Sequence, residues 1–241
     1  MPLPTISTPT YELVLPSTEQ KIKYRPFLVR EEKLLVLALE TEDTKEITNS
    51  IKQVIKNCVQ TKNVKIESLP TFDIEYLFLN IRGKSVGEEV EVNIICPDDG
   101  ETQVPVTIPL DEINVVRDEK HTKQIKLDNS LTMDMKYPSL EQFIKNNFDT
   151  NQGNVSNIDQ SFDLIVECID KIYSDEEVWA SEDVTKKELK EFLEQMNSTQ
   201  FREIEKFFST MPKLSYTVKV TNPNTKVESE VVLEGLASFF G

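Results

Sequence analysis

The hydrophobic pattern of this chain changes its period in blocks. Apolar residues recur at helical spacing in two long stretches, and elsewhere they alternate with polar residues as in half-buried strands. A doubly wound parallel sheet would instead alternate strand and helix along the whole sequence. The pattern therefore predicts an α+β fold, in which helical blocks alternate with antiparallel β-hairpins.

Five segments follow from this pattern. They are an N-terminal extended arm and hairpin (1–25), a helical block (26–88), a β-hairpin region (89–138), a second helical block (139–211), and a C-terminal hairpin with an apolar tail (212–241). Prolines at positions 2, 4 and 9 keep the arm out of the centre of any sheet. The polar segment 149–157 has no period and is predicted to be an exposed loop.

Individual elements are predicted from the same periods. The predicted helices cover 31–39, 47–59, 74–81, 158–172, 189–196 and 201–208. Capped helix starts are predicted at 139–142 and, as a capping box, at 185–188. The predicted hairpins pair 11–15 with 21–24, 90–94 with 104–108, 125–127 with 131–135, and 216–220 with 227–233. The unbroken run LLVLAL implies that the first helix is buried on nearly every side. The helix at 74–81 is apolar on several faces and should lie in the middle of its block.

The charge balance argues against nucleic-acid binding. The 241 residues include 42 acidic and 27 basic side chains, which gives a formal net charge of −15. A protein that neutralises phosphates needs a surplus of lysine and arginine on at least one face, and the basic residues here are scattered among carboxylates. We therefore expect no nucleic-acid partner.

The number and spacing of the cysteines and the length of the apolar runs indicate the cellular compartment in which the chain is made. The three cysteines, Cys58, Cys96 and Cys168, are far apart and odd in number, which makes a disulfide framework improbable and favours a reducing interior. The N-terminus lacks the basic residues and the apolar run of a signal peptide. No apolar stretch approaches the roughly 18–20 residues that cross a bilayer. We expect a soluble protein made inside the cell, without a membrane partner.

The sequence lacks the parts of a catalytic or metal centre. Its single histidine, His121, stands between lysines without an obvious nucleophile to serve, so we expect a surface histidine. Cys96 begins a turn where a zinc ribbon would place a ligand, but no second thiol follows, and the turn at 222–224 has none. The two hairpins that contain these turns, 90–94 with 104–108 and 216–220 with 227–233, are therefore interpreted as metal-free relatives of metal-binding zinc knuckles. The Asp-Thr-Asn-Gln-Gly pattern at 149–153 matches a calcium loop poorly. We predict no catalytic residue, metal or cofactor.

Three features point to protein partners instead. The arm cannot build its own sheet, the terminal Phe239 and Phe240 would leave an apolar patch in water, and the hairpins offer open edges. Each feature has an alternative: the arm can be disordered, the two rings can fold back onto the chain's own core, and charged residues can guard the edges. Taken together in a chain without catalytic parts, they favour an interaction protein.

A resemblance to a known family rests on several segments. The run RPFLVREEKLL at 25–35 resembles a signature of the T4-like bacteriophage baseplate family, which includes the baseplate hub subunit and the hub assembly catalyst. Further agreeing segments are TISTPTYEL at 5–13, Cys58, DIEYLF at 73–78, Arg82, SVGE at 85–88 and LASFF at 236–240. Some family members carry further cysteines in the turns after the strands. This chain keeps only Cys96 there, which puts a metal role in doubt.

The resemblance implies a structural component of a contractile-tailed phage baseplate in the hub region, assembled in the host cytoplasm and present in the virion. The alternative is an assembly chaperone for the hub that is absent from the finished particle. A metal-binding module is the weaker alternative. Implied partners are other baseplate and hub proteins, and copies of the chain itself in a symmetric ring are left open. No enzymatic activity is implied.

The Arg-Pro-Phe-x-x-x-Glu-Glu segment can be interpreted in two ways. In the structural interpretation, which we favour, Pro26 ends the hairpin, Phe27 staples the helix start, and Glu31 and Glu32 offset the helix dipole. In the functional interpretation, Arg25 and the two glutamates dock a neighbouring subunit. The candidate interface residues are Tyr11, Leu13, Arg25, Phe27, Glu31, Glu32, Phe239 and Phe240.

Overall fold

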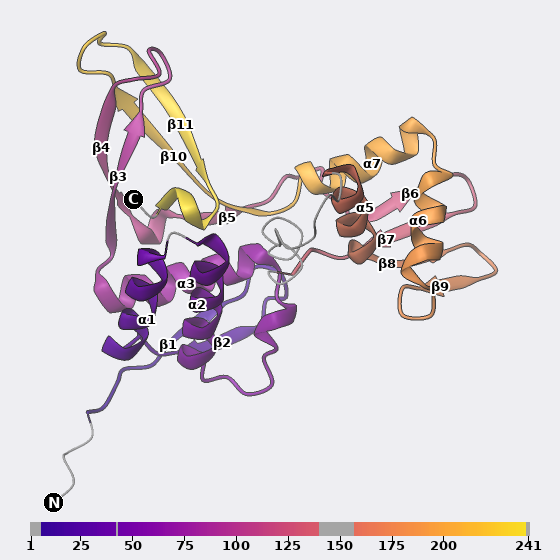
Figure 1. Cartoon of the computed structure of the whole chain (residues 1–241), viewed down its shortest axis with the longest axis horizontal. Helices are drawn as coiled ribbons and strands as arrows, with labels where there is room; N and C mark the ends of the chain where they lie inside the picture. The colour runs from indigo at the N-terminus through magenta and orange to yellow at the C-terminus, as the bar shows by residue number, and fades with distance from the viewer. Residues whose placement is uncertain (1–5, 42, 140–156, 240–241) are drawn as a thin grey trace, which may run out of the picture. The chain divides into compact units, whose positions relative to one another are not determined.

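The structure, a computed structural model, describes residues 6–41, 43–139 and 157–239 (Figure 1). The chain forms two compact units. Unit 1 comprises Met1–Val116 and Lys213–Gly241, and unit 2 comprises Arg117–Pro212, so unit 2 is inserted between the two parts of unit 1. Both contain helices and small antiparallel sheets, which confirms the predicted α+β class.

Unit 1 opens with a hairpin and three helices. Strand β1 (Tyr11–Val14) pairs antiparallel with β2 (Lys21–Tyr24), as predicted. The helices are α1 (Val29–Glu40), α2 (Thr44–Cys58) and α3 (Thr71–Val86), and a short 3₁₀ turn, η1 (Ile66–Ser68), precedes α3. Helix α3 buries residues on several faces, including Phe72, Ile74, Leu77, Phe78, Leu79 and Ile81. Its burial on several faces agrees with the prediction from its apolar pattern, while α2 is the helix that packs against both α1 and α3.

Two long hairpins complete unit 1. One consists of β3 (Glu89–Ile95) and β4 (Gln103–Pro109), and the other of β10 (Lys213–Thr221) and β11 (Glu228–Glu234). Both were predicted. Strand β5 (Asn114–Val116), which was not predicted, adds to β10 and makes a three-stranded sheet. The turns η2 (Leu110–Glu112) and η3 (Leu236–Phe239) follow β4 and β11. The buried strand residues include Val90, Val92, Ile94, Ile108, Val218 and Val220.

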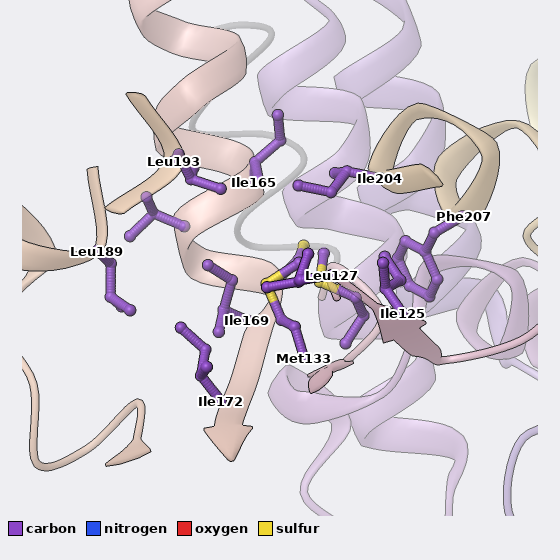
Figure 2. Packing of buried hydrophobic residues seen from close by; sticks show 13 residues of the cluster. Ile125, Leu127, Met133, Ile165, Ile169, Ile172, Leu189, Leu193, Ile204 and Phe207 are labelled. Carbon is purple, nitrogen blue, oxygen red and sulfur yellow. The ribbon is translucent and has the colours of Figure 1, made fainter. Parts of the chain in front are cut away.

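Unit 2 packs helices on a four-stranded antiparallel sheet. The sheet order is β6 (Gln124–Lys126), β7 (Thr132–Met135), β8 (Ile169–Tyr173) and β9 (Val178–Ala180). The helices are α5 (Asn157–Cys168), α6 (Lys186–Glu194) and α7 (Ser198–Ser209). Figure 2 shows the core, where side chains from the sheet meet those of the helices. The core includes Ile125, Met133, Ile165, Ile169, Ile172, Leu189, Leu193, Ile204 and Phe207.

Two predictions in unit 2 are corrected or fall outside the described residues. The single helix predicted over 158–172 ends at Cys168, and Ile169 begins strand β8. Pairing with β7 and β9 explains this change, because Ile169-Asp-Lys-Ile also satisfies a strand alternation. Strand β9 was not predicted. Residues 149–156 of the predicted loop, the calcium-like pattern at 149–153 and most of the predicted helix start at 139–142 lie outside the described residues, and the last residue of the predicted loop, Asn157, begins α5.

The burial predicted for α1 is also wrong. Val36, Leu37 and Leu39 are 48%, 50% and 49% exposed, while only Glu31 and Ala38 of this helix are buried. Helix α1 packs against α2 along one side, so the unbroken apolar run cannot be covered all round by unit 1.

Candidate protein–protein interface

The Arg-Pro-Phe segment is held by a buried ion pair. Arg25 Nη2 lies 3.1 Å from Glu31 Oε1, and the two residues are 8% and 1% exposed. Burial opposes ionisation of Glu31. Hydrogen bonds from the Arg25 side chain, the Leu28 backbone N–H and the Arg30 side chain outweigh this effect and lower the pKa of Glu31 to about 2. The pair therefore fixes the start of α1 internally.

Arg25 and Phe27 connect this segment to the other helices. The guanidinium of Arg25 also donates to the Pro26 carbonyl oxygen at 2.8 Å and lies 3.6 Å from Cys58 Sγ at the end of α2. Burial raises the pKa of the Cys58 thiol to about 11. The Phe27 backbone N–H donates to Ser85 Oγ on α3 at 2.9 Å. The family-like segments at 25–35 and 85–88 and the family-like residue Cys58 are thus connected by contacts inside unit 1.

Two carboxylates of α3 anchor segments at opposite ends of the chain. Asp73, fully buried, accepts hydrogen bonds from the backbone N–H of Ser17, at 3.0 Å, and from its hydroxyl group. Glu75 Oε1 accepts from the Leu236 backbone N–H at 3.2 Å. Burial raises the pKa of Glu75 to about 7, although that hydrogen bond acts in the opposite direction. Helix α3 therefore ties both the β1–β2 turn and the C-terminal turn to one core.

Most of the predicted interface residues point inward. Leu13 is buried, and the half-buried Tyr11 ring lies 5.9 Å from the ring of Tyr24. Phe239 is fully buried, so the expectation that its ring forms an exposed patch is wrong, and the fold-back alternative holds for this residue. The ring packs in the core because η3 turns the chain back after β11. Glu32 is exposed on α1, and Phe240 lies outside the described residues.

A group of exposed apolar side chains lies on the outer side of α1. Val29 is 78% exposed, and it shares this side with the half-exposed Val36, Leu37 and Leu39. We call these four residues the α1 face. Glu32, Lys33 and Glu40 are exposed among them. Sequence reasoning missed this surface, although one signal was present: an apolar run in a helix that follows a short hairpin has few neighbours to cover it.

The tips of the two long hairpins meet, as a ribbon of two knuckles would require. The buried amide of Asn222 donates to Asp99 Oδ2 at 2.8 Å and to both Asp98 carboxylate oxygens at 3.1 Å. Thr225 Oγ1 donates to Asp98 Oδ2 at 2.5 Å. Hydrogen bonds from the Thr102 side chain, from the backbone N–H groups of Thr102 and Glu101, and from the Asn222 amide hold the pKa of Asp99 below its usual range. Among the described residues, no group of three or more His, Cys, Asp or Glu side chains is placed to hold a metal.

His121 in unit 2 is not a simple surface residue. Its Nδ1 lies 2.9 Å from Thr210 Oγ1, its Nε2 lies 3.0 Å from the Tyr137 hydroxyl, and its ring stacks on Tyr137. Burial, together with the charge of Lys123, lowers the pKa of His121. The prediction of a surface histidine is met only in part, because the ring is half-buried and hydrogen-bonded at both nitrogens.

Comparison with known proteins identifies the family of the chain. No curated protein and no solved structure matches the chain. None of the described helices has the length and apolar character needed to span a membrane. The family model described as T4 bacteriophage base plate protein matches residues 8–241, nearly the whole chain. The chain therefore belongs to the T4 bacteriophage base plate protein family.

Proposed function

We propose that this chain is a structural subunit of the hub region of a contractile-tail baseplate, assembled in the host cytoplasm and retained in the virion. It acts through protein–protein interfaces and has no catalytic role. The observation that carries this proposal is the contrast between two parts of unit 1. Charged residues of the family-like segments are buried in internal contacts, while large apolar side chains of α1 face outward.

The α1 face is the proposed contact with a neighbouring baseplate protein. Apolar helix surfaces of this kind bind apolar grooves on a partner, with anchors spaced about one or two turns apart. Val29 and Val36 are two turns apart on α1, and Leu37 and Leu39 widen the face. The charged side chains among them, Glu32, Lys33 and Glu40, would require hydrogen-bonding or oppositely charged groups on the partner. The net charge of −15 supports solubility before assembly.

The test has two parts. Mass spectrometry of purified virions should find peptides of this chain at a fixed copy number per tail. Their absence, together with a requirement for the protein during tail assembly, would replace the structural role with that of an assembly chaperone. The second part is the variant Val36→Ser/Leu37→Ser/Leu39→Ser, which should reduce incorporation into tails while the isolated protein remains folded.

A matched control uses apolar residues that are exposed elsewhere in unit 1. Val86 at the end of α3 and Val232 on β11 are 61% and 55% exposed. The variant Val86→Ser/Val232→Ser should leave incorporation unchanged. Equal incorporation of both variants would count against α1 as the docking helix, and it would leave the family assignment unaffected.

A further inference from the structure

A single row of apolar side chains crosses all four strands of the unit 2 sheet. Cross-strand pairing places Ile125 opposite Met133, Met133 opposite Ile172, and Ile172 opposite Trp179. The first three side chains are buried, while Trp179 at the β9 end is 37% exposed. Figure 2 shows Ile125 close to Phe207 at the β6 end. The row thus ends in an exposed indole on β9 and in a buried isoleucine on β6.

Both edge strands direct backbone groups outward in the same pattern. Met135 N donates to Lys123 O, and Leu127 N donates to Leu131 O, so residues 123, 125 and 127 face β7. Gln124 and Lys126 therefore direct their backbone groups away from the sheet. On β9, Ser174 N donates to Glu177 O and Ser181 N donates to Asp170 O, which leaves Val178 and Ala180 facing outward.

These two edges match in register. If β9 of another copy lay antiparallel to β6, Gln124 would pair with Ala180 and Lys126 with Val178. That register places Trp179 directly opposite Ile125, so the apolar row would continue from one sheet into the next. The strand directions also agree, because β6 and β9 are opposite edges of a sheet whose neighbouring strands are all antiparallel.

A groove beside β6 provides room for this contact. A cavity of about 540 Å³ lies between the segment at 120–126 and helix α7. Its lining includes Ile125 and Phe207, both almost fully buried, together with the side chains of Lys120, Lys126 and Lys206. Thr122 Oγ1 currently bonds the Gln124 N–H at 3.1 Å and the Gln124 carbonyl at 3.3 Å. An incoming strand would replace these two local bonds with ladder bonds.

The charges of the two edges are opposite. The groove carries Lys120, Lys126 and Lys206, with Glu203 as its one acidic lining residue. Strand β9 is flanked by the exposed carboxylates of Asp175, Glu176, Glu177, Glu182 and Asp183. In the register above, Lys126 lies opposite Val178, which directly follows the acidic β8–β9 turn at 175–177. Pairing two β9 edges, or two β6 edges, would instead oppose like charges.

We propose that unit 2 binds a second copy of this chain edge to edge, with β9 of one copy added to β6 of the next and Trp179 seated in the groove beside Ile125. The contact is heterologous, because each copy uses two different edges, and such contacts close into rings or extend as filaments. This inference goes beyond the proposed function and does not depend on the role of α1.

The test measures the mass of the full chain by analytical ultracentrifugation over a range of concentrations at low and high salt. We expect the mass to rise with concentration and the association to weaken with added salt. The variants Lys120→Glu/Lys126→Glu and Glu176→Lys/Glu182→Lys should each weaken self-association by about tenfold or more. Mixing the two variants should restore it, because each then meets an edge of opposite charge. A wild-type chain that stays monomeric at every concentration and salt level would overturn the proposal.

A backbone variant separates edge pairing from general charge attraction. Val178→Pro removes an outward N–H of β9 while its bonds to β8 remain, so it should also weaken association by about tenfold, with an unchanged circular dichroism spectrum. Loss of association in the lysine variant alone would indicate that a different acidic protein surface binds the groove, and that β9 is not the occupant. Failure of the mixture to recover would likewise overturn the proposal.

Discussion

Asn222 Nδ2 lies 2.8 Å from Asp99 Oδ2, although the two residues belong to different hairpins of unit 1. Asn222 is fully buried, and the same amide also bonds Asp98. The Asn222 amide, together with Thr225 and Asn224, therefore joins the two β-turns at the place where a zinc ribbon would use a metal. The hairpins are joined at their tips by neutral-to-charged hydrogen bonds, which are stronger than bonds between neutral groups.

Replacing this amide should loosen the hairpin tips. Asn222→Ala removes the buried amide that bonds the carboxylates of Asp98 and Asp99, and it should lower the free energy of unfolding by about 1–3 kcal/mol. Asn222→Asp should cost more at neutral pH, because a third carboxylate joins Asp98 and Asp99, and part of the loss should be recovered in acid. Urea unfolding measures both effects. The control Asn224→Ala removes only an exposed bond to Thr102 and should have a smaller effect. Equal losses in the two alanine variants would contradict the assigned role.

The contact between these tips shows what the sequence alone could and could not predict. Each turn is recognisable from its own residues, because Pro97 to Gly100 and Asn222 to Asn224 are local turn formers. Likewise the capping box of Thr185 and Glu188 was predicted and is present, since it depends only on residues within one turn. The pairing of Asn222 with Asp98, 124 positions away in the chain, depends on how the two hairpins pack, and no local pattern encodes that arrangement.

Short elements and surface exposure were the harder parts for the same reason. Strands β5 and β9 have three residues each and exist because a neighbouring strand pairs with them. The run at 34–39 predicted a helix correctly, yet its exposure depends on how many elements unit 1 can place around α1. The family-like residues were recognisable in sequence. Their inward orientation required the contacts of Arg25 and Glu75.

Glu75 should make unit 1 less stable as the pH rises. Its pKa is about 7 in the folded chain, compared with an ordinary value of 4.5, so the folded state holds the proton more tightly. The free energy of unfolding should therefore fall between pH 4.5 and about 7, by an amount on the order of 3 kcal/mol. Glu75→Gln keeps an acceptor for the Leu236 N–H and removes the charge. This variant should be more stable than the wild type near pH 8, and its free energy of unfolding should fall less as the pH rises.

Urea unfolding at several pH values measures this effect. The control Glu88→Gln changes an exposed carboxylate of unit 1 and should leave the decline in place. A wild-type stability that rises steadily across this pH window, with Glu75→Gln showing the same slope, would contradict the role of Glu75.

The Arg25–Glu31 pair should act in the opposite pH direction. The pKa of Glu31 is lowered to about 2 in the folded chain, so its contribution is present above pH 4.5 and is lost as the pH falls toward 2. Arg25→Met removes the buried partner of Glu31 and leaves it with the mostly exposed Arg30, so it should cost up to about 3–5 kcal/mol at neutral pH. Arg25→Met/Glu31→Met should recover part of this loss.

An exposed ion pair of unit 1 provides the control. Lys23 Nζ lies 3.4 Å from Glu12 Oε1, and both side chains are more than half exposed. Lys23→Met should change stability by less than about 1 kcal/mol. If Arg25→Met behaved like Lys23→Met while incorporation into tails failed, Arg25 would belong to a docking surface and the structural interpretation would be wrong.

Variants of Phe239 test whether its ring is an internal anchor of unit 1 or part of an interface. Its ring is fully buried in unit 1, and the preceding Gly235 has φ +72, which lets the chain turn back from β11 into η3. Phe239→Ala should therefore lower the free energy of unfolding of the isolated protein by about 3–5 kcal/mol. Phe239→Leu keeps most of the buried volume and should cost less. Thermal and urea unfolding of the monomer measure both. A fully stable Phe239→Ala monomer that fails to enter tails would place this ring at an interface.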